Sequence, residues 1–293
     1  MSNLKEVRTR IASVKSTKQI TSAMKMVAAS KLRKAQNAIL QLRPYVNKLQ
    51  EILQSISASL ESSGENIYSR QNEVNNVLLV VLTSNRGLCG AFNSNVIKVT
   101  TRQIEANYAS YLKAGRLNLI TIGKHASEYF KKHNYPVVER YDDIYDSLTF
   151  DNVVPIAEKV MNEYAEGKYD HVEIIYNQFK NAAVQQLLIE QYLPVKSDVD
   201  LEFGEVFIDY IFEPSKEEIV NELIPKSLKL QLFKALLDSY ASEQGARMTA
   251  MHLATDNATE LLKELKVSYN KARQASITNE ILEIVSGAEA LKG

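Results

Sequence analysis

A seven-residue apolar repeat runs through the first sixty residues and constrains the fold more than any other feature. Two positions in each heptad form a seam, and fourteen of the seventeen seam positions between Leu4 and Leu60 are apolar. A heptad sustained over this length predicts a coiled-coil helix rather than the face of a globular helix. Asn3 followed by Glu6 predicts the N-cap of this helix, and Pro44 falls outside the seam.

The three polar exceptions, Lys18, Thr21 and Lys25, occupy consecutive positions of the seam. A seam loses apolar character where its helix contacts something other than its partner helix. It also loses apolar character where a polar pair sets the register of the coil. Composition favours neither interpretation over the other.

The last eighty residues repeat the seam less regularly. Ser215 followed by Glu218 predicts a capping box, and glycine and proline are scarce in both terminal stretches. Helices of these lengths would reach roughly 85 and 105 Å, which is too long to lie fully against a compact middle domain. The two ends are therefore expected to form an antiparallel two-helix coiled coil. The alternative is a bundle of broken helices, with Pro225 as one break.

The middle of the chain alternates between strand and helix patterns. The run VLLVVLT from Val77 predicts a strand that is buried on both faces. Further strands are predicted at 117–122, 136–141 and 170–176, with helices at 94–113, 124–133 and 152–166. Two more strands, 187–192 and 205–212, have no helix between them, so antiparallel pairing is expected. The alternation predicts a doubly wound, Rossmann-like α/β domain with a mostly parallel sheet.

Charge divides along the same lines. Residues 1–60 carry a net charge of +9, residues 61–214 carry −8 and residues 215–293 carry −1, so the whole chain sums to zero. Such separation suggests that different stretches face different partners. The predicted organisation is an N-terminal coiled-coil helix (1–63), a central α/β domain (64–214) and a C-terminal coiled-coil helix (215–293).

Several kinds of site and location are excluded by the residues. The sequence contains no apolar run of about 18 residues, so no membrane-spanning helix is expected. The start MSNLKEVRTR lacks the apolar core of a secretory signal. The four histidines share no metal-ligand spacing, and neither GxxxxGK[ST] nor GxGxxG follows a strand. The basic N-terminus has no aromatic residue before Tyr45 on which a base would stack, so no nucleic-acid partner is expected. No metal or cofactor site is predicted.

The one enzymatic candidate is Cys89, the only cysteine, in the RGLCG loop after the first strand. Loops at the carboxyl ends of strands are where α/β sites lie, and Arg86 would lower the pKa of a neighbouring thiol. The competing interpretation is a tight glycine-rich turn with a small apolar thiol packed inside, since no histidine lies near in sequence. A free-standing α/β enzyme with a coiled-coil arm, using Cys89, is the alternative function.

Three separated motifs resemble one family. They are RIASVKSTKQITSAMKMVAASKLRKA from Arg10, SEQGARMTAMHLATDNA from Ser242 and KARQASITNEILEIVSGAEAL from Lys271. Together with the loop SNRGLCGAFN, they make the chain similar to the gamma subunit of F-type ATP synthases over essentially its whole length.

This resemblance implies a rotor without catalytic residues or cofactor. In that family the terminal helices form a coiled coil that turns inside a ring of alpha and beta subunits, and the α/β domain meets epsilon and the c ring. Proton flow through the c ring turns the shaft and drives the beta sites through sequential changes of affinity. The implied location is the cytoplasmic side of a bacterial inner membrane, as a peripheral protein.

The resemblance also implies contact residues. Met24, Arg273, Gln274 and Thr278 are expected to face loops of the beta subunit, which in the family are acidic. Arg247 is expected to pair within the shaft with Glu280 or Glu283. The segment YIFEP is expected to contact the c ring and epsilon through Tyr210, Phe212 and Glu213.

Overall fold

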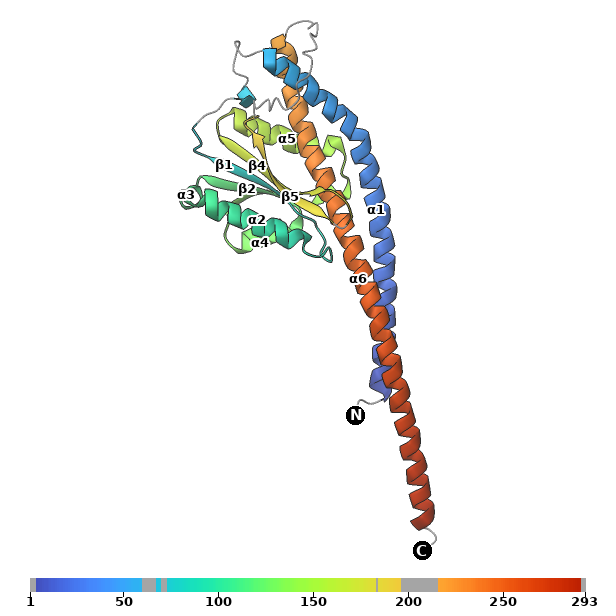
Figure 1. Cartoon of the computed structure of the whole chain (residues 1–293). Coiled ribbons are helices and arrows are strands. Elements are labelled where there is room, and N and C mark those ends of the chain that lie inside the picture. Colours follow the sequence, from blue (N-terminus) through green and yellow to red (C-terminus); the bar gives the residue numbers. More distant parts are fainter. Residues whose placement is uncertain (1–3, 60–66, 70–72, 183, 196–215, 291–293) are drawn as a thin grey trace. The chain divides into compact units, whose positions relative to one another are not determined.

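The computed structural model describes residues 4–59, 67–69, 73–182, 184–195 and 216–290 (Figure 1). The chain divides into a terminal unit, residues 1–28 with 247–293, and a central unit, residues 29–246. The predicted boundaries at 63 and 214 lie outside the described residues. The predicted strand 205–212 and the predicted caps Asn3 and Ser215 lie outside them as well.

Two long helices carry the terminal stretches. Helix α1 spans Leu4–Ser59 and helix α6 spans Lys216–Ala290. Both helices continue through a proline, Pro44 in α1 and Pro225 in α6. The prediction of two long helices is therefore confirmed, and the alternative of a bundle broken at Pro225 is wrong.

In the terminal unit the two helices run antiparallel. Thr21 of α1 meets Thr255 of α6, whereas Ile11, nearer the start of α1, shares a groove with Leu262 and Lys266, further along α6. Opposite directions along the two helices follow from this order of contacts. The predicted seam is the buried face, and its least exposed members are Val7, Thr21, Ala28, Arg247, Met251, Ala258 and Leu265.

The central unit is built on a five-stranded sheet of order β3-β2-β1-β4-β5. The strands are β1 Val77–Leu82, β2 Leu117–Ile122, β3 Val137–Tyr141, β4 His171–Phe179 and β5 Gln185–Leu193. The first four strands are parallel to one another, and β5 pairs antiparallel with β4. All five predicted strands within the described residues are confirmed, including the antiparallel pairing.

Helices cover both faces of this sheet. The short helices are α2 Phe92–Asn107, α3 Ala109–Lys113, α4 Lys124–Lys132 and α5 Phe150–Ala165. Helices α2 and α4 pack on the face that carries Val77, Leu79 and Val81 of β1 (Figure 1). Helix α5 and part of α6 pack on the other face. The β1 run is buried at every position because both of its faces are covered.

One predicted helix, 94–113, is divided by Tyr108. This residue has φ −124° and ψ 14°, outside the helical region, and separates α2 from α3. Its hydroxyl donates a hydrogen bond of 2.8 Å to Glu173 on β4. The break therefore coincides with a tertiary contact that the helical spacing does not show.

The central part of α6 lies close to the sheet. Tyr192 of β5 donates a hydrogen bond to the carbonyl of Leu228, and Ser242 donates one to the carbonyl of Asn177. Gly245 faces Ala182 in the β4–β5 turn, where a Cβ on the glycine would lie 3.2 Å from the Ala182 carbonyl oxygen. Gly245 thus permits a close backbone approach between α6 and this turn.

Candidate interaction surfaces

The polar window of the seam forms a contact between the two helices of the terminal unit. Thr21 Oγ1 lies 2.8 Å from Thr255 Oγ1, and Thr21 is 8% exposed. Each threonine also has a backbone acceptor on its own helix, Lys18 O and Met251 O respectively. A polar pair inside a seam specifies register, so the structure favours the register interpretation for Thr21.

A groove of about 660 Å³ lies beside this contact. Its basic lining residues are Lys15 and Lys18 of α1 and Lys266 of α6, and Met26 and Leu262 supply part of its apolar surface. The positive charge predicted for the N-terminal stretch is therefore gathered partly on one surface of the terminal unit. A surface of this kind suits a partner that carries carboxylates.

The four residues expected to contact the beta subunit lie in the terminal unit. Met24 is half-buried on α1, whereas Arg273, Gln274 and Thr278 are exposed on α6. Thr278 donates a hydrogen bond of 2.9 Å to the backbone carbonyl of Gln274, one turn earlier on the same helix. The exposure of these side chains is compatible with contact to another protein.

The same end of α6 carries aliphatic residues that sequence analysis did not single out. They are Ile277, Ile281, Leu282, Ile284 and Val285, and between 47% and 71% of each is exposed. An exposed row of large apolar side chains marks an interaction surface. Leu282 belongs to the seam expected from the sequence, whereas the other four are apolar residues outside that seam, which was the available sequence signal.

The predicted ion pair between Arg247 and Glu280 or Glu283 is wrong. All three residues lie on the single continuous helix α6, so 33 or more residues separate their positions. At 1.5 Å per residue the separation is roughly 50 Å, far beyond ion-pairing distance. Arg247 is instead buried at the seam, and Glu280 accepts a hydrogen bond of 3.3 Å from Ser276.

The Cys89 loop is closed by its own side chains. Cys89 is 1% exposed, and Asn93 Nδ2 donates a hydrogen bond of 3.4 Å to its sulfur. Asn93 Oδ1 accepts a hydrogen bond of 2.9 Å from the backbone N–H of Ser84 at the end of β1. The thiol faces the carbonyl of Arg86 at 3.8 Å. This geometry supports the interpretation of a tight turn with a packed thiol.

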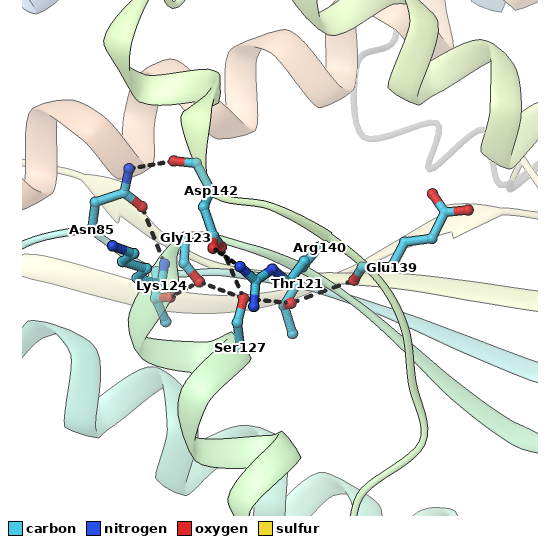
Figure 2. Close-up of polar contacts among 9 residues, drawn as sticks. Asn85, Thr121, Gly123, Lys124, Ser127, Glu139, Arg140 and Asp142 are labelled. Atoms are coloured by element: carbon cyan, nitrogen blue, oxygen red, sulfur yellow. Dashed lines mark hydrogen bonds and ion pairs between the residues drawn. The ribbon is translucent and has the colours of Figure 1, made fainter.

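A second polar cluster joins the carboxyl ends of β1, β2 and β3 (Figure 2). Asn85 accepts a hydrogen bond of 3.1 Å from the backbone N–H of Lys124, and its amide donates to the carbonyl of Asp142. Ser127 donates to the Asp142 carboxylate, which also pairs with Arg140 at 3.3 Å. The first turn of α4 is thus already hydrogen-bonded by protein groups, so the cluster ties strand ends together rather than holding an anion.

A third cluster surrounds Glu173, which is 9% exposed on β4. Its carboxylate accepts hydrogen bonds from Tyr108 and Gln103 and lies 3.2 Å from His171 Nε2. Burial would raise the pKa of Glu173, but the hydrogen bonds from these three partners outweigh burial and hold the pKa below its usual value. The carboxylate is therefore a charged link between β4 and α2.

Among the residues that the structure describes, no group of three or more His, Cys, Asp and Glu side chains is placed to hold a metal ion. None of the helices in the same residues has the length and apolar character needed to cross a bilayer. Tyr210, Phe212 and Glu213 lie outside the described residues.

Comparison with known proteins bears directly on these surfaces. A family model described as "ATP synthase" matches residues 3–291. The chain is 56% identical to the "ATP synthase gamma chain" of Flavobacterium psychrophilum over 296 residues, covering 100% of both chains. It is 57% identical to the "ATP synthase gamma chain" of Christiangramia forsetii over 293 residues, again covering 100% of both.

Solved structures share the fold. One is the central stalk and c ring of the Tetrahymena thermophila mitochondrial ATP synthase, where the match has a TM-score of 0.61 at 29% identity and covers 80% of this chain and 99% of that one. Another, from the Euglena gracilis mitochondrial ATP synthase in rotational state 3, has a TM-score of 0.70 at 23% identity and covers 98% and 94%. The resemblance found in the three sequence motifs is thus confirmed.

Proposed function

Because the chain belongs to the ATP synthase gamma-chain family, we propose that it transmits torque between a proton-driven c ring and a catalytic head of alpha and beta subunits. The observation that carries this proposal is identity above 50% along the whole chain to proteins named ATP synthase gamma chain. The two long helices α1 and α6 add a physical reason, because a shaft needs elements that resist bending and twisting.

The seam of the terminal unit supports a mechanical role. Buried small and polar residues such as Ala28, Thr21 and Ala258 let the two helices approach closely and fix their register. A coil held in one register turns as one body, since slippage of one helix along the other would break the Thr21–Thr255 contact. Torque applied at one end of the coil is then passed along it.

We propose that the far end of α6 engages the catalytic head. Arg273, Gln274 and Thr278 would meet loops of the beta subunit, and the exposed aliphatic row around Ile281 would lie inside the ring. Met24 and the basic groove with Lys18 would face the same loops from α1.

At the other end, the proposed partners are epsilon and the c ring. Tyr210, Phe212 and Glu213 are the proposed contact residues in that region. The protein would then be a peripheral protein on the cytoplasmic side of a bacterial inner membrane. Its relatives are named as bacterial ATP synthase chains, which supports this location.

We also propose that this chain catalyses no reaction itself. Cys89 is buried and hydrogen-bonded in its turn, so substrate has no direct path to its sulfur. The alternative of a free-standing enzyme is tested by measuring the ATPase of the purified chain with and without alpha and beta subunits. Activity of the isolated chain that Cys89→Ala abolishes would establish the alternative, and activity that appears only in the assembled complex supports the shaft.

The contact residues are tested in the assembled enzyme in sealed vesicles. We expect Arg273→Ala with Gln274→Ala to lower proton-driven ATP synthesis about fivefold, equivalent to about 1 kcal/mol. The control is Lys113→Ala on the exposed end of α3, which lies in the central unit. An unchanged rate of ATP synthesis in a normally assembled double variant would show that Arg273 and Gln274 are not contact residues. Failure of the unaltered chain to assemble with alpha and beta subunits would contradict the proposed function itself.

A further inference from the structure

A cavity of about 290 Å³ lies in the central unit where α1, the end of β4 and α6 meet. Its volume is at the lower end of the range for small-molecule sites, about 300–1,000 Å³, so it suits a small ligand. The lining residues come from all three elements. They are Ile39, Leu42, Arg43, Val46, Gln178, Phe179, Lys180, Lys234 and Asp238.

The charges in this cavity are unbalanced. Arg43 from α1, Lys180 from the end of β4 and Lys234 from α6 face a single acid, Asp238 of α6. The lining therefore carries two more positive than negative charges. The rest of the lining includes an apolar part, called here the apolar wall, to which Leu42 and Phe179 belong. This combination suits a ligand with one anionic group and a short apolar body.

Asp238 is the unusual member of the set. It is 5% exposed, and no residue in the described part of the chain gives its carboxylate a hydrogen bond or an ion pair within contact distance. Buried carboxylates normally have such partners, because an unpaired buried charge is unfavourable. A largely buried carboxyl that lines a cavity without a protein partner is a polar group available to a ligand.

Groups from every neighbouring element face Asp238. Lys234, Arg43 and Lys180 favour its charged form, whereas burial and the charge of Glu190 on β5 oppose it. Burial has the largest effect and raises the pKa of Asp238 to about 6. The Glu190 carboxylate already accepts hydrogen bonds from Tyr176 and Gln231, so it is not the group that meets a ligand.

We propose that this cavity binds an aliphatic monocarboxylate, whose head group lies among Arg43, Lys180 and Lys234 and accepts a hydrogen bond from a protonated Asp238. The ligand's chain would cover the apolar wall. Two carboxyl groups joined by a hydrogen bond share one proton between them. Binding therefore takes up one proton from solution onto Asp238. The site is independent of the proposed shaft function, since it uses other residues.

The probe is octanoate, titrated calorimetrically into the full-length chain. Because binding needs the protonated acid, we expect the association constant to rise roughly 50-fold from about pH 8 to about pH 5.5. In buffers of different ionisation enthalpy near neutral pH, the observed heat should reveal uptake of close to one proton for each octanoate bound. Absence of octanoate binding at the lower pH, at millimolar concentrations, would overturn the proposal.

Two variants separate the site from general surface binding. Asp238→Asn keeps a hydrogen-bond donor without titrating, so octanoate should still bind but without pH dependence or proton uptake. Arg43→Gln removes the charge of an exposed side chain, and we expect it to weaken binding about tenfold. Lys113→Gln, on the exposed helix α3, is the matched control and should leave the affinity unchanged.

Other ligands test the stated chemistry. Octylamine has the same chain with the opposite charge and should not compete with octanoate. Inorganic phosphate lacks the chain and should bind more weakly than octanoate. Equal binding of octylamine, or an Asp238→Asn variant with the original pH dependence, would contradict the proposal.

Discussion

In the central unit Leu79 and Leu119 are completely buried, whereas in the terminal unit Ile281 and Leu282 are more than half exposed. The difference follows from what lies opposite each residue. Both faces of the sheet are covered by helices of the same chain. In the terminal unit the pairing of Thr21 with Thr255 places the start of α1 near residue 272, so α6 continues beyond its partner helix.

This contrast shows that apolar burial within the chain is concentrated in the central unit. The central unit has the enclosed apolar core that a domain needs to be stable by itself. The last turns of α6 bury little apolar surface in the described chain. Contact with another protein would bury more of that surface. Substitutions should therefore affect stability in one region and assembly in the other.

The largest difference in stability between the two units is expected from substituting one leucine in each. Leu79→Ala removes a fully buried side chain between β1 and α2, and we expect the free energy of unfolding to fall by about 3–4 kcal/mol. Leu282→Ala is the matched control, with an expected change below about 0.5 kcal/mol in the isolated chain. Urea unfolding of both variants measures the difference, and similar losses for the two would contradict the contrast.

A glycine pair tests the strand ends of the central unit. Gly123 has φ +104°, and a Cβ there would lie 2.1 Å from the carbonyl oxygen of Thr83. Gly123→Ala should therefore cost about 2–4 kcal/mol, since β1 and β2 must move apart. Gly115→Ala has no atom within 4 Å of the new Cβ and φ +69°, so only the backbone penalty of about 1 kcal/mol remains. Equal thermal shifts for the two variants would contradict this steric account.

The buried carboxylate Glu173 predicts a pH dependence confined to the central unit. Its pKa is lowered in the folded chain, so its stabilising contribution is present above the unfolded value near 4.5 and is lost as pH falls through the lower folded value. Glu173→Gln should cost about 1–3 kcal/mol at neutral pH and less in acid. Denaturant titrations from neutral pH into acid measure this, with the exposed Glu105→Gln as control. A loss that stays constant with pH would show that charge is not the cause.

The smallest effect is expected in the seam of the terminal unit. Thr21→Val and Thr255→Val remove the two hydroxyls that meet at 2.8 Å, and a double-mutant cycle should give a coupling of about 0.5–1 kcal/mol. The exposed Thr9→Val, which loses only a bond to its own helix, is the control. Chemical unfolding of the four proteins of the cycle measures the coupling, and additive single effects would show that the pair does not set the register.

The periodic parts of the fold were predictable from sequence. The seam of α1 and the five described strands follow from repeats of apolar residues, since such repeats reflect which faces are covered. The break at Tyr108 was not predicted because the residue leaves the helix for a contact with Glu173, about 65 positions away. Local spacing carries no information about such a partner.

The candidate sites divide in the same way. The turn around Cys89 was interpretable because its glycines and small residues are neighbours in sequence. The supposed pairing of Arg247 with Glu280 failed because a continuous helix separates residues in proportion to their spacing. The cavity at Asp238 could not be predicted from sequence, because its lining residues come from three separate elements. A single aspartate in a helical pattern is indistinguishable from a solvent-exposed one.

The aliphatic row from Ile277 to Val285 also affects how the protein has to be produced. Free chains in excess of their partners would bury these side chains against one another, because association is the remaining way to remove them from water. The concentration of unassembled chain therefore sets the competition between self-association and productive assembly. Matched synthesis of all the subunits keeps that concentration low, and co-expression with the partners is the corresponding strategy for purification.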